Sequence, residues 1–548
     1  QGGPSRTFKS QGITNSDWFV LLGGDGHQPA TEPGNPNIVY AQSQQGNLHR
    51  VDRTTGEAVF IKPYSGLNEQ YERFNWDSPI LVSSHDPKRL YFASQRVWRS
   101  DDRGDSWTAI SNDLSLNQER LSLPIMGRVQ SWDSPWDVYA MSTYNTITSL
   151  SESPLNENHI YAGTDDGLIH YTKNNGSEWV TMSVDKLPNL PKSSFVNDIK
   201  ADLHDVNTVY VALDNHKFGD YSPYLFKSKD GGKSWKSIVE GLPKETLIWR
   251  IVQDHIDPNL LFLATEYGLY FSNNQGEKWI KFSNGLPTIS IRDLAIQKRE
   301  NDLVLATFGR SFYVLDDYSP LRNINSETSK DYILFETKEA LQYNPVRSGS
   351  SSQGTSYFKS KNPPYGAIFT YNLPKSYETL KSKRKKIENK LNKENKDIPF
   401  PGWNNLDKEN NENLPSIILE IVDKNGLIID RINGSSKKGI NRVSWSLTKP
   451  ILSVIKSDSR FSYPRSIPVN PGTYGVRLME LKDGKYDLVA SEKKFQVKRI
   501  RENILKNPMS NQIDKLVSDF IDFDKEYTLI LDNYIKAKKK MSKFEQAI

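Results

Sequence analysis

Short apolar segments separated by polar turns recur through residues 1–322 of the chain. In each unit a turn rich in Asn, Asp or Pro precedes an aliphatic and aromatic strand, a Gly-containing loop follows, and a second strand closes the unit. Successive units place one strand residue 51, 70, 49, 52 and 42 positions apart: Tyr40, Tyr91, Tyr161, Tyr210, Phe262 and Val304. A period of this length is typical of β-propeller blades. The pattern therefore predicts a β-propeller of which six blades are visible.

Four of these units end in one polar pattern, Ser/Thr-x-Asp/Asn-x-Gly-x-x-Trp. The copies are Ser100, Asp102, Gly104 and Trp107; Thr172, Asn174, Gly176 and Trp179; Ser228, Asp230, Gly232 and Trp235; and Ser272, Asn274, Gly276 and Trp279. The Asp or Asn side chain can accept backbone N–H bonds in the turn, Gly takes the left-handed conformation, and Trp packs the hairpin onto the blade. Because the pattern repeats where catalysis would need a single site, we interpret these residues as structural.

The sixth unit lacks this pattern and runs from Thr307 to Arg322 as TFGRSFYVLDDYSPLR. The repeated turns resemble the Asp-box, or BNR repeat, of sialidase-type and sortilin-type propellers. With the sixth unit, four further segments resemble the large bacterial repeat proteins labelled sortilin-like or glycosyl hydrolase: Asn75 to Pro79, Leu123 to Arg128, Gly163 to Gly167 and Asp214 to Lys217. The resemblance implies that this chain, which starts at Gln1, corresponds to the C-terminal half of a longer protein. It also implies that the propeller is incomplete at its N-terminus and has seven or more blades with the upstream part.

The repeat stops after residue 322, and residues 323–500 predict a second, smaller β domain. Its expected strands alternate in polarity and are joined by turns such as Asp423 to Gly426, which favours an antiparallel sandwich. The segments Gly439 to Trp445 and Pro471 to Tyr474 resemble the immunoglobulin-like modules of bacterial surface proteins. A Lys- and Glu-rich stretch at 377–400 predicts an exposed helical insertion, and the Ser/Gly-rich stretch 348–354 predicts a flexible loop.

Residues 501–548 predict a helical tail. Its apolar residues recur at three- and four-residue steps, which is the pattern of an amphipathic helix: Ile513, Leu516, Val517, Phe520, Phe523, Tyr527, Ile530 and Tyr534. We expect this stripe to be an intrachain packing face.

Composition restricts the chemistry. The chain has 71 basic and 66 acidic residues, so its net charge of +5 is small for 548 residues and argues against a nucleic-acid partner. The absence of cysteine removes disulfides, thiol nucleophiles and thiolate metal sites. Of the histidines, His204 and His255 are expected on the face opposite His27 and His216, so we expect no metal site and no cofactor. No segment has the length and hydropathy of a membrane span.

Propeller topology brings the start of each innermost strand and the loop between the second and third strands to one face, here called the mouth. The side chains expected to bind a ligand at the mouth are Arg96, Tyr144, His216, Arg250, Tyr267, Arg292 and Arg310. Arginines and aromatic rings are the groups that recognise sugars or peptides. Three mouth carboxylates are candidates for acid–base or nucleophilic catalysis in glycoside hydrolysis: Asp25, Asp77 and Asp165.

We therefore expect an extracellular or cell-surface binding and assembly module of a larger bacterial protein. Its expected partners are the upstream propeller half and a polysaccharide, a peptide or a surface protein. The alternative is a glycoside hydrolase acting on polysaccharide, and a third possibility is a sortilin-like peptide receptor. A sialidase is disfavoured because the usual Arg-Ile-Pro start is absent. The resemblance implies a secreted, periplasmic or outer-surface location in a Gram-negative bacterium.

Overall fold

The computed structural model describes the chain except for residues 26–27, 125–126, 134–142, 193, 326, 347–357, 414, 452–464, 483, 502–509 and 548. The stretch 348–354, predicted as a flexible loop, lies outside the described residues. The chain divides into two compact units. The first contains Gln1–Ser5 and Asn15–Arg322, and the second contains Arg6–Thr14 and Asn323–Ile548.

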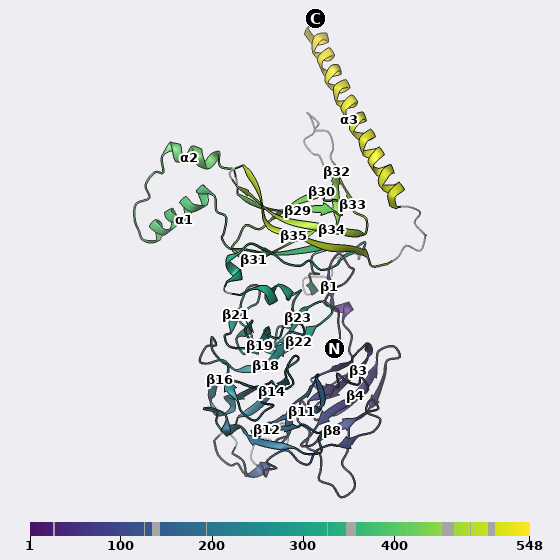
Figure 1. Ribbon diagram of the computed structural model, residues 1–548, viewed down its shortest axis with the longest axis vertical. Helices are drawn as coiled ribbons and strands as arrows, with labels where there is room; N and C mark the ends of the chain where they lie inside the picture. The colour runs from purple at the N-terminus through teal and green to yellow at the C-terminus, as the bar shows by residue number, and fades with distance from the viewer. Residues whose placement is uncertain are drawn as a thin grey trace. The chain divides into compact units, whose positions relative to one another are not determined.

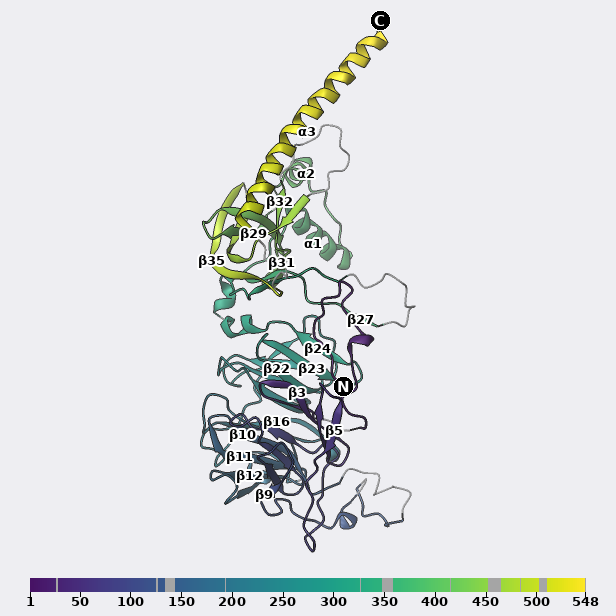
Figure 2. The same ribbon diagram turned by 90° about the vertical axis from the view of Figure 1, so that its right-hand side faces the viewer.

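Six antiparallel sheets follow one another along the first unit (Figures 1 and 2). Sheet one contains β2 (Ala30–Glu32), β3 (Asn35–Ser43), β4 (Asn47–Asp52) and β5 (Glu57–Phe60). Sheet two contains β6 (Ile80–Val82), β7 (Leu90–Ala93), β8 (Val97–Ser100) and β9 (Thr108–Ala109). Sheet three contains β10 (Ile147–Ser153), β11 (Asn156–Thr164), β12 (Leu168–Thr172) and β13 (Val180–Ser183).

The remaining three sheets repeat this order. Sheet four contains β14 (Phe195–Ala201), β15 (Val209–Asn215), β16 (Asp220–Ser228) and β17 (Lys236–Ser237). Sheet five contains β18 (Ile248–Gln253), β19 (Leu261–Thr265), β20 (Gly268–Ser272) and β21 (Ile280–Phe282). Sheet six has only three strands, β22 (Ile291–Gln297), β23 (Asp302–Thr307) and β24 (Phe312–Leu315). The chain is mainly β and contains a β-propeller, as the repeat predicts.

Each sheet is held by apolar contacts with the next sheet. In β19, Leu261 and Leu263 pack with sheet four, whereas Phe262 and Ala264 pack with sheet six. Side chains alternate between the two faces of a strand, so a strand buried on both faces is apolar throughout, as LFLAT is. This double burial explains why the second strand of each unit carries the strongest signal in the sequence.

The four polar turns have the local bonding predicted from their residues. In the first, Ser100 Oγ donates to Asp102 Oδ1 at 2.7 Å and accepts from the N–H of Gly104 at 2.8 Å. Asp102 also accepts from the N–H of Ser106 at 2.9 Å. Gly104 has φ +89°, a conformation that disfavours residues with a Cβ. The other three turns repeat these bonds.

Three of the four tryptophans also tie their turn to the preceding sheet. The indole N–H groups of Trp107, Trp179 and Trp279 donate to the carbonyls of Ile61, Ile110 and Ile238 at 2.7, 2.9 and 2.7 Å. Trp235 instead donates to Gly232 in its own turn at 3.1 Å. The turns therefore stabilise both the hairpin and the stacking of neighbouring sheets.

Within the described residues, sheets one and six do not pack against each other in the way that the other neighbouring sheets do. The N-terminal segment makes contacts with both. Trp18 stacks on Phe312 of β24, with ring centroids 5.7 Å apart and planes at 12°, and the guanidinium of Arg53 lies 4.6 Å from the ring centre of Phe19. The face of sheet six turned away from sheet five stays exposed at Ala295. Among the described sheets, sheet six therefore packs extensively on sheet five only.

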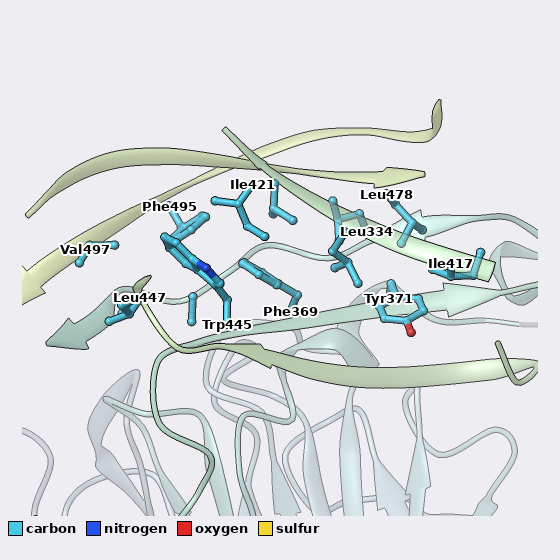
Figure 3. Close-up of a cluster of buried hydrophobic side chains, with 14 of the residues drawn as sticks. Leu334, Phe369, Tyr371, Ile417, Ile421, Trp445, Leu447, Leu478, Phe495 and Val497 are labelled. Carbon is cyan, nitrogen blue, oxygen red and sulfur yellow. The ribbon is translucent and has the colours of Figure 1, made fainter. Parts of the chain in front are cut away.

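The second unit contains two sheets with one core between them, shown in Figure 3. One sheet contains β25 (Ile333–Leu334), β28 (Ala367–Leu373) and β31 (Gly439–Trp445). The other contains β26 (Ala340–Gln342), β35 (Lys485–Arg499), β34 (Gly472–Lys482), β29 (Ser416–Asp423) and β30 (Ile428–Gly434). Phe369, Tyr371 and Trp445 of the first sheet meet Ile421 and Phe495 of the second. The unit is therefore a β-sandwich.

Two short pairings complete this unit. β32 (Thr448–Ile451) pairs with β33 (Arg465–Pro468), and β1 (Ile13–Thr14) pairs with β27 (Lys359–Ser360). The N–H of Thr7 also donates to Asn362 Oδ1 at 2.9 Å across 355 residues of sequence. Residues 6–14 thus belong to the second unit, although their sequence position places them within 1–322.

Three α-helices are described, of which α1 and α3 lie within the predicted stretches 377–400 and 501–548, whereas α2 begins just after the first. The charged insertion forms α1 (Leu380–Lys393) and α2 (Trp403–Asn410), joined by Arg384 and Glu409 at 2.7 Å. The tail forms one long helix, α3 (Ser510–Ala547). Most of the predicted stripe is exposed, namely Leu516, Phe520, Phe523, Tyr527, Ile530 and Tyr534, while Val517 is half-buried. The expectation of an intrachain packing face is therefore wrong for these six residues. None of the described helices is long and apolar enough to cross a membrane.

Replacing Asp102 with Ala should lower the free energy of unfolding of the propeller by about 1 to 3 kcal/mol, because the turn loses its acceptor. The hydroxyl and the N–H of Ser106 lower the pKa of Asp102 to about 2. The carboxylate therefore stabilises the fold above its unfolded pKa, and this contribution is lost as the pH falls from about 4 to 2. Urea unfolding at pH 7 and pH 2.5 measures both effects.

Asp105 provides the matched control, since it lies in the same turn and pairs with Arg50 at 2.9 Å on the surface. Asp105→Ala should cost below about 1 kcal/mol. Equal losses for the two variants would contradict the role given to Asp102.

Candidate functional site

A cleft of about 310 Å³ opens where loops of sheets four, five and six meet. Its lining residues are His216, Tyr221, Glu245, Leu247, Trp249, Glu266, Tyr267 and Arg292. These residues come from β18 and the segment before it, from the starts of β16 and β22, and from the loops that follow β15 and β19. The loop positions are those that propeller topology predicts for the mouth. Three of the expected ligand-binding residues, His216, Tyr267 and Arg292, therefore line one cleft.

A stacked arginine forms the centre of the cleft. The guanidinium of Arg292 lies 3.7 Å from the ring centre of Trp249, while its Nη1 lies 3.9 Å from Glu266 Oε2. Trp249 is buried, and its indole N–H donates to the same carboxylate oxygen at 3.0 Å. The guanidinium thus lies against the ring and near the carboxylate, while the Arg292 side chain stays 50% exposed.

Two tyrosine rings and a second carboxylate surround this centre. Tyr221 and Tyr267 are 52% and 50% exposed, and Glu245 is exposed as well. Glu266 is more tightly held, because Ser290 Oγ also donates to it at 2.9 Å. The cleft thus presents flat apolar faces beside planar donors and carboxylate acceptors, the combination that recognises hydroxyl-rich ligands.

His216 lies against the same tryptophan. Its ring meets Trp249 edge-on at 5.7 Å, and its Nδ1 is hydrogen-bonded to Asp214. Burial lowers the pKa of Arg292, while the carboxylates of Glu266, Asp214 and Asp77 act in the opposite direction. Asp77 is therefore within electrostatic range of the cleft although it comes from the loop before sheet two.

The other candidate binding residues lie outside the cleft. Arg96 donates to Glu69 at 2.9 Å, forms an ion pair with Glu72 and covers the ring of Trp98. Arg250 donates to the carbonyl of Asn197 and lies 3.4 Å from Asp293. Both guanidinium groups therefore join parts of the propeller.

Tyr144 and Arg310 are also placed elsewhere. Tyr144 is half-buried beneath the guanidinium of Arg120, 5.6 Å from the ring centre, and burial raises the pKa of Tyr144 to about 12. Arg310 is exposed in the loop between β23 and β24. Neither side chain lines the 310 Å³ cleft.

The catalytic candidates occupy different environments. Asp25 is exposed, and its backbone carbonyl accepts from the indole N–H of Trp76 at 3.3 Å. Asp165 is only 5% exposed and accepts from the N–H and hydroxyl of Thr146 at 2.8 and 2.7 Å. Burial raises the pKa of Asp165 to about 7, helped by the neighbouring charge of Asp166. Asp165 is thus almost closed to solvent and bonded to Thr146.

Five of the lining residues are not among those predicted from the sequence: Tyr221, Leu247, Trp249, Glu266 and Glu245. Of these, Glu245 is the exposed carboxylate. It lies three residues before β18, on the segment that enters an innermost strand, so the rule used for the mouth applies to it as well. A larger cleft of about 490 Å³ lies beside the first polar turn. Its charges pair with protein groups, as in Arg50–Asp105 at 2.9 Å and Arg103–Glu32 at 2.7 Å, so it is a weaker candidate.

Potential metal ligands do not gather anywhere in the described part of the chain, where no group of three His, Asp or Glu side chains is placed to hold an ion. His204 and His255 lie by the turns before β15 and β19. His204 Nε2 is hydrogen-bonded to the carbonyl of Asp254 at 2.9 Å. His27 lies outside the described residues.

Part of the chain is similar in sequence to proteins named as xyloglucanases. No family model matches the chain. It is 23% identical over 288 residues to the "Probable oligoxyloglucan-reducing end-specific xyloglucanase" of Neosartorya fischeri, covering 52% of this chain and 30% of that protein. It is 24% identical over 344 residues to a xyloglucanase of Acetivibrio thermocellus, covering 55% and 38%. The chain thus spans little more than a third of these relatives at most.

Solved structures of low similarity include the GH74 xyloglucanase of Xanthomonas campestris. That match has a TM-score of 0.37 and 14% identity, and it covers 54% of this chain and 52% of that one. The extracellular domain of a hybrid two-component system from B. thetaiotaomicron matches with a TM-score of 0.35 and 10% identity, covering 84% and 48%.

The buried Asp165 should make stability depend on pH. Its folded pKa of about 7 exceeds the unfolded value of about 3.9, so the folded state binds the proton more tightly and stability falls as the pH rises from about 4 to 7. Asp165→Asn should remove this decline and raise the thermal midpoint at pH 8 relative to wild type. Calorimetric scans of both proteins at pH 5 and pH 8 measure it.

Asp198, buried in sheet four, provides the comparison. Asp198→Asn should leave the decline between pH 5 and pH 8 in place. An unchanged decline in Asp165→Asn would contradict the assignment to Asp165.

Proposed function

We propose that the propeller binds a polysaccharide, of the xyloglucan class, at the cleft formed by Trp249, Tyr267 and Arg292. The observation that carries the proposal is the Arg292–Trp249 stack with two half-exposed tyrosines beside it. Sugar rings have apolar faces that stack on aromatic rings and hydroxyls that pair with planar donors and carboxylates. The xyloglucanase names of the curated relatives support this ligand class.

Binding fits the cleft better than hydrolysis does. Glycoside hydrolysis needs two carboxyl groups on either side of the scissile bond. In the cleft, Glu266 is held by Trp249, Ser290 and Arg292, which leaves Glu245 as the more exposed carboxylate. Among the three aspartates, Asp165 is buried. The second candidate function is a glycoside hydrolase, favoured by the relatives' names, whose second carboxylate lies on another part of a larger protein.

We also propose the setting in which this binding takes place. The four polar turns support an Asp-box propeller of the sortilin-like kind, part of a longer bacterial protein with further blades upstream. The exposed face of sheet six supports an upstream partner of this type. The two-sheet second unit would be an immunoglobulin-like module, and the protein would act in the periplasm, at the outer surface or outside a Gram-negative cell.

Tyr267→Ala should weaken binding of a xyloglucan oligosaccharide by about 1 to 2 kcal/mol, because one stacking face is removed. Tyr267→Phe keeps that face and should bind within about threefold of wild type. Arg292→Ala removes a charged donor and should cost about 1.5 to 3 kcal/mol. Titration calorimetry measures the three dissociation constants.

Pro87 lies in the turn before β7 on the opposite face. Pro87→Ala should therefore leave the dissociation constant unchanged in the same titrations. Loss of binding in Pro87→Ala but not in Tyr267→Ala would place the ligand on the face opposite the mouth and would contradict the proposed cleft. A library of peptides titrated in parallel tests the receptor alternative, and tight peptide binding without glycan binding would refute the proposal.

A binding module should release no sugar product from xyloglucan, and Asp77→Asn should change affinity only modestly. Chromatography of the reaction mixture after long incubation measures product. If wild type releases product while Asp77→Asn or Glu245→Gln stops release and retains binding, the chain is a hydrolase and the first proposal is wrong.

A further inference from the structure

The exposed stripe of α3 follows a strict heptad repeat. From Leu516 the most exposed large apolar residues recur with steps of four and three: Leu516, Phe520, Phe523, Tyr527, Ile530, Tyr534, Met541 and Phe544, with Ala537 at the remaining position. The eight large side chains are each between 56% and 72% exposed. A repeat of 3.5 residues kept over four heptads is the signature of a coiled coil, because it keeps one apolar seam on one side of a supercoiled helix.

The rest of the described second unit does not cover this seam. The most buried residue of the helix is Thr528, which is not part of the stripe. A single helix of 38 residues with an exposed aromatic seam is unfavourable in water, so the seam needs an occupant. Eight side chains of this size, more than half exposed, offer roughly 700 to 900 Å² per helix. That area matches the ~800 Å² that each partner of a stable complex buries.

Charge along α3 is separated into two halves. Residues 515–532 contain five acidic residues and two lysines, and residues 533–547 contain five lysines and one glutamate. Two copies in antiparallel orientation place the acidic half of each helix against the basic half of the other. We therefore propose that α3 forms an antiparallel coiled coil with a second copy of this chain.

One register of the antiparallel pair brings the apolar seams together and also places opposite charges side by side. With Asp532 at the two-fold axis, Phe520 meets Phe544 of the second copy, Tyr527 meets Ala537, and Ile530 meets Tyr534. On the flanks, Glu526 meets Lys540 and Asp524 meets Lys538, each pair occurring twice by symmetry.

A parallel pair gives less favourable charge pairs on the two sides of the apolar seam. It sets Asp519 against Asp524 and Glu526 against Leu531, and only Lys540 with Glu545 attracts. The charges therefore favour the antiparallel orientation over the parallel one.

Oligomeric mass tests the pairing in the full 548-residue chain. Sedimentation equilibrium should give twice the monomer mass of 62.6 kDa. Ile530→Lys should give the monomer mass with the propeller's thermal unfolding unchanged, because α3 lies outside the first unit. A wild-type monomer at concentrations of tens of micromolar would overturn the proposal and assign the seam to another occupant.

Charge reversal tests the register. Glu526→Lys and Lys540→Glu should each weaken the dimer on the order of tenfold, and the double variant should restore it. In a parallel pair the Lys540→Glu change would place a second carboxylate against Glu545. The double variant would then not recover, which would overturn the orientation.

Cysteine cross-linking tests the orientation of the two helices directly, because the chain has no cysteine of its own. Asn533→Cys lies beside the two-fold axis and should give a disulfide-linked dimer on mild oxidation. Ala537→Cys in the two copies would be about 15 Å apart along the helix and should stay unlinked. A parallel coil would link Ala537→Cys instead, and absence of both links would contradict the pairing.

Discussion

Packing of each propeller sheet between two neighbours is the constraint on which the rest of the first unit depends. The inner strands are not joined by a backbone ladder from sheet to sheet, so side chains bridge them. Thr148 Oγ1 donates to the carbonyl of Val196 at 2.8 Å, and the N–H of Ile251 donates to Asp198 Oδ2 at 3.0 Å. With the apolar contacts of both faces, these bonds fix where each loop emerges. The cleft depends on that fixation, because its residues come from three sheets.

The same constraint explains the edge of the propeller. Sheet six buries Leu303 and Leu305 against sheet five, whereas Val304 and Ala306 on its other face are only half-buried. The stacked pair of Trp18 and Phe312 covers a part of that face. Strand β23 thus carries apolar residues on both faces but has a packed sheet on one face only.

The features that can be predicted from the sequence are those that depend on interactions between residues close together in the chain. The polar turns close through bonds within a few residues, as between Ser100 and Gly104, so four turns and their spacing suffice to predict a propeller. The mouth rule uses no distances, and three of the residues that it names, His216, Tyr267 and Arg292, line one cleft. The other four, Arg96, Tyr144, Arg250 and Arg310, lie outside that cleft. Interactions between distant residues carry no such signal. The pairing of Arg96 with Glu72 and the burial of Asp165 depend on how sheets stack, and the contact of Thr7 with Asn362 spans 355 residues.

The central claim is that glycan recognition takes place at the cleft between sheets four, five and six. Hydrogen–deuterium exchange with and without saturating xyloglucan oligosaccharide tests it most directly, since it reads every loop in one experiment. The account predicts slower exchange in peptides that contain residues 216–221, 245–250, 266–267 and 291–293, with no change at the turns before β7 and β19. Protection confined to the sandwich or α3, or to those opposite turns, would contradict it.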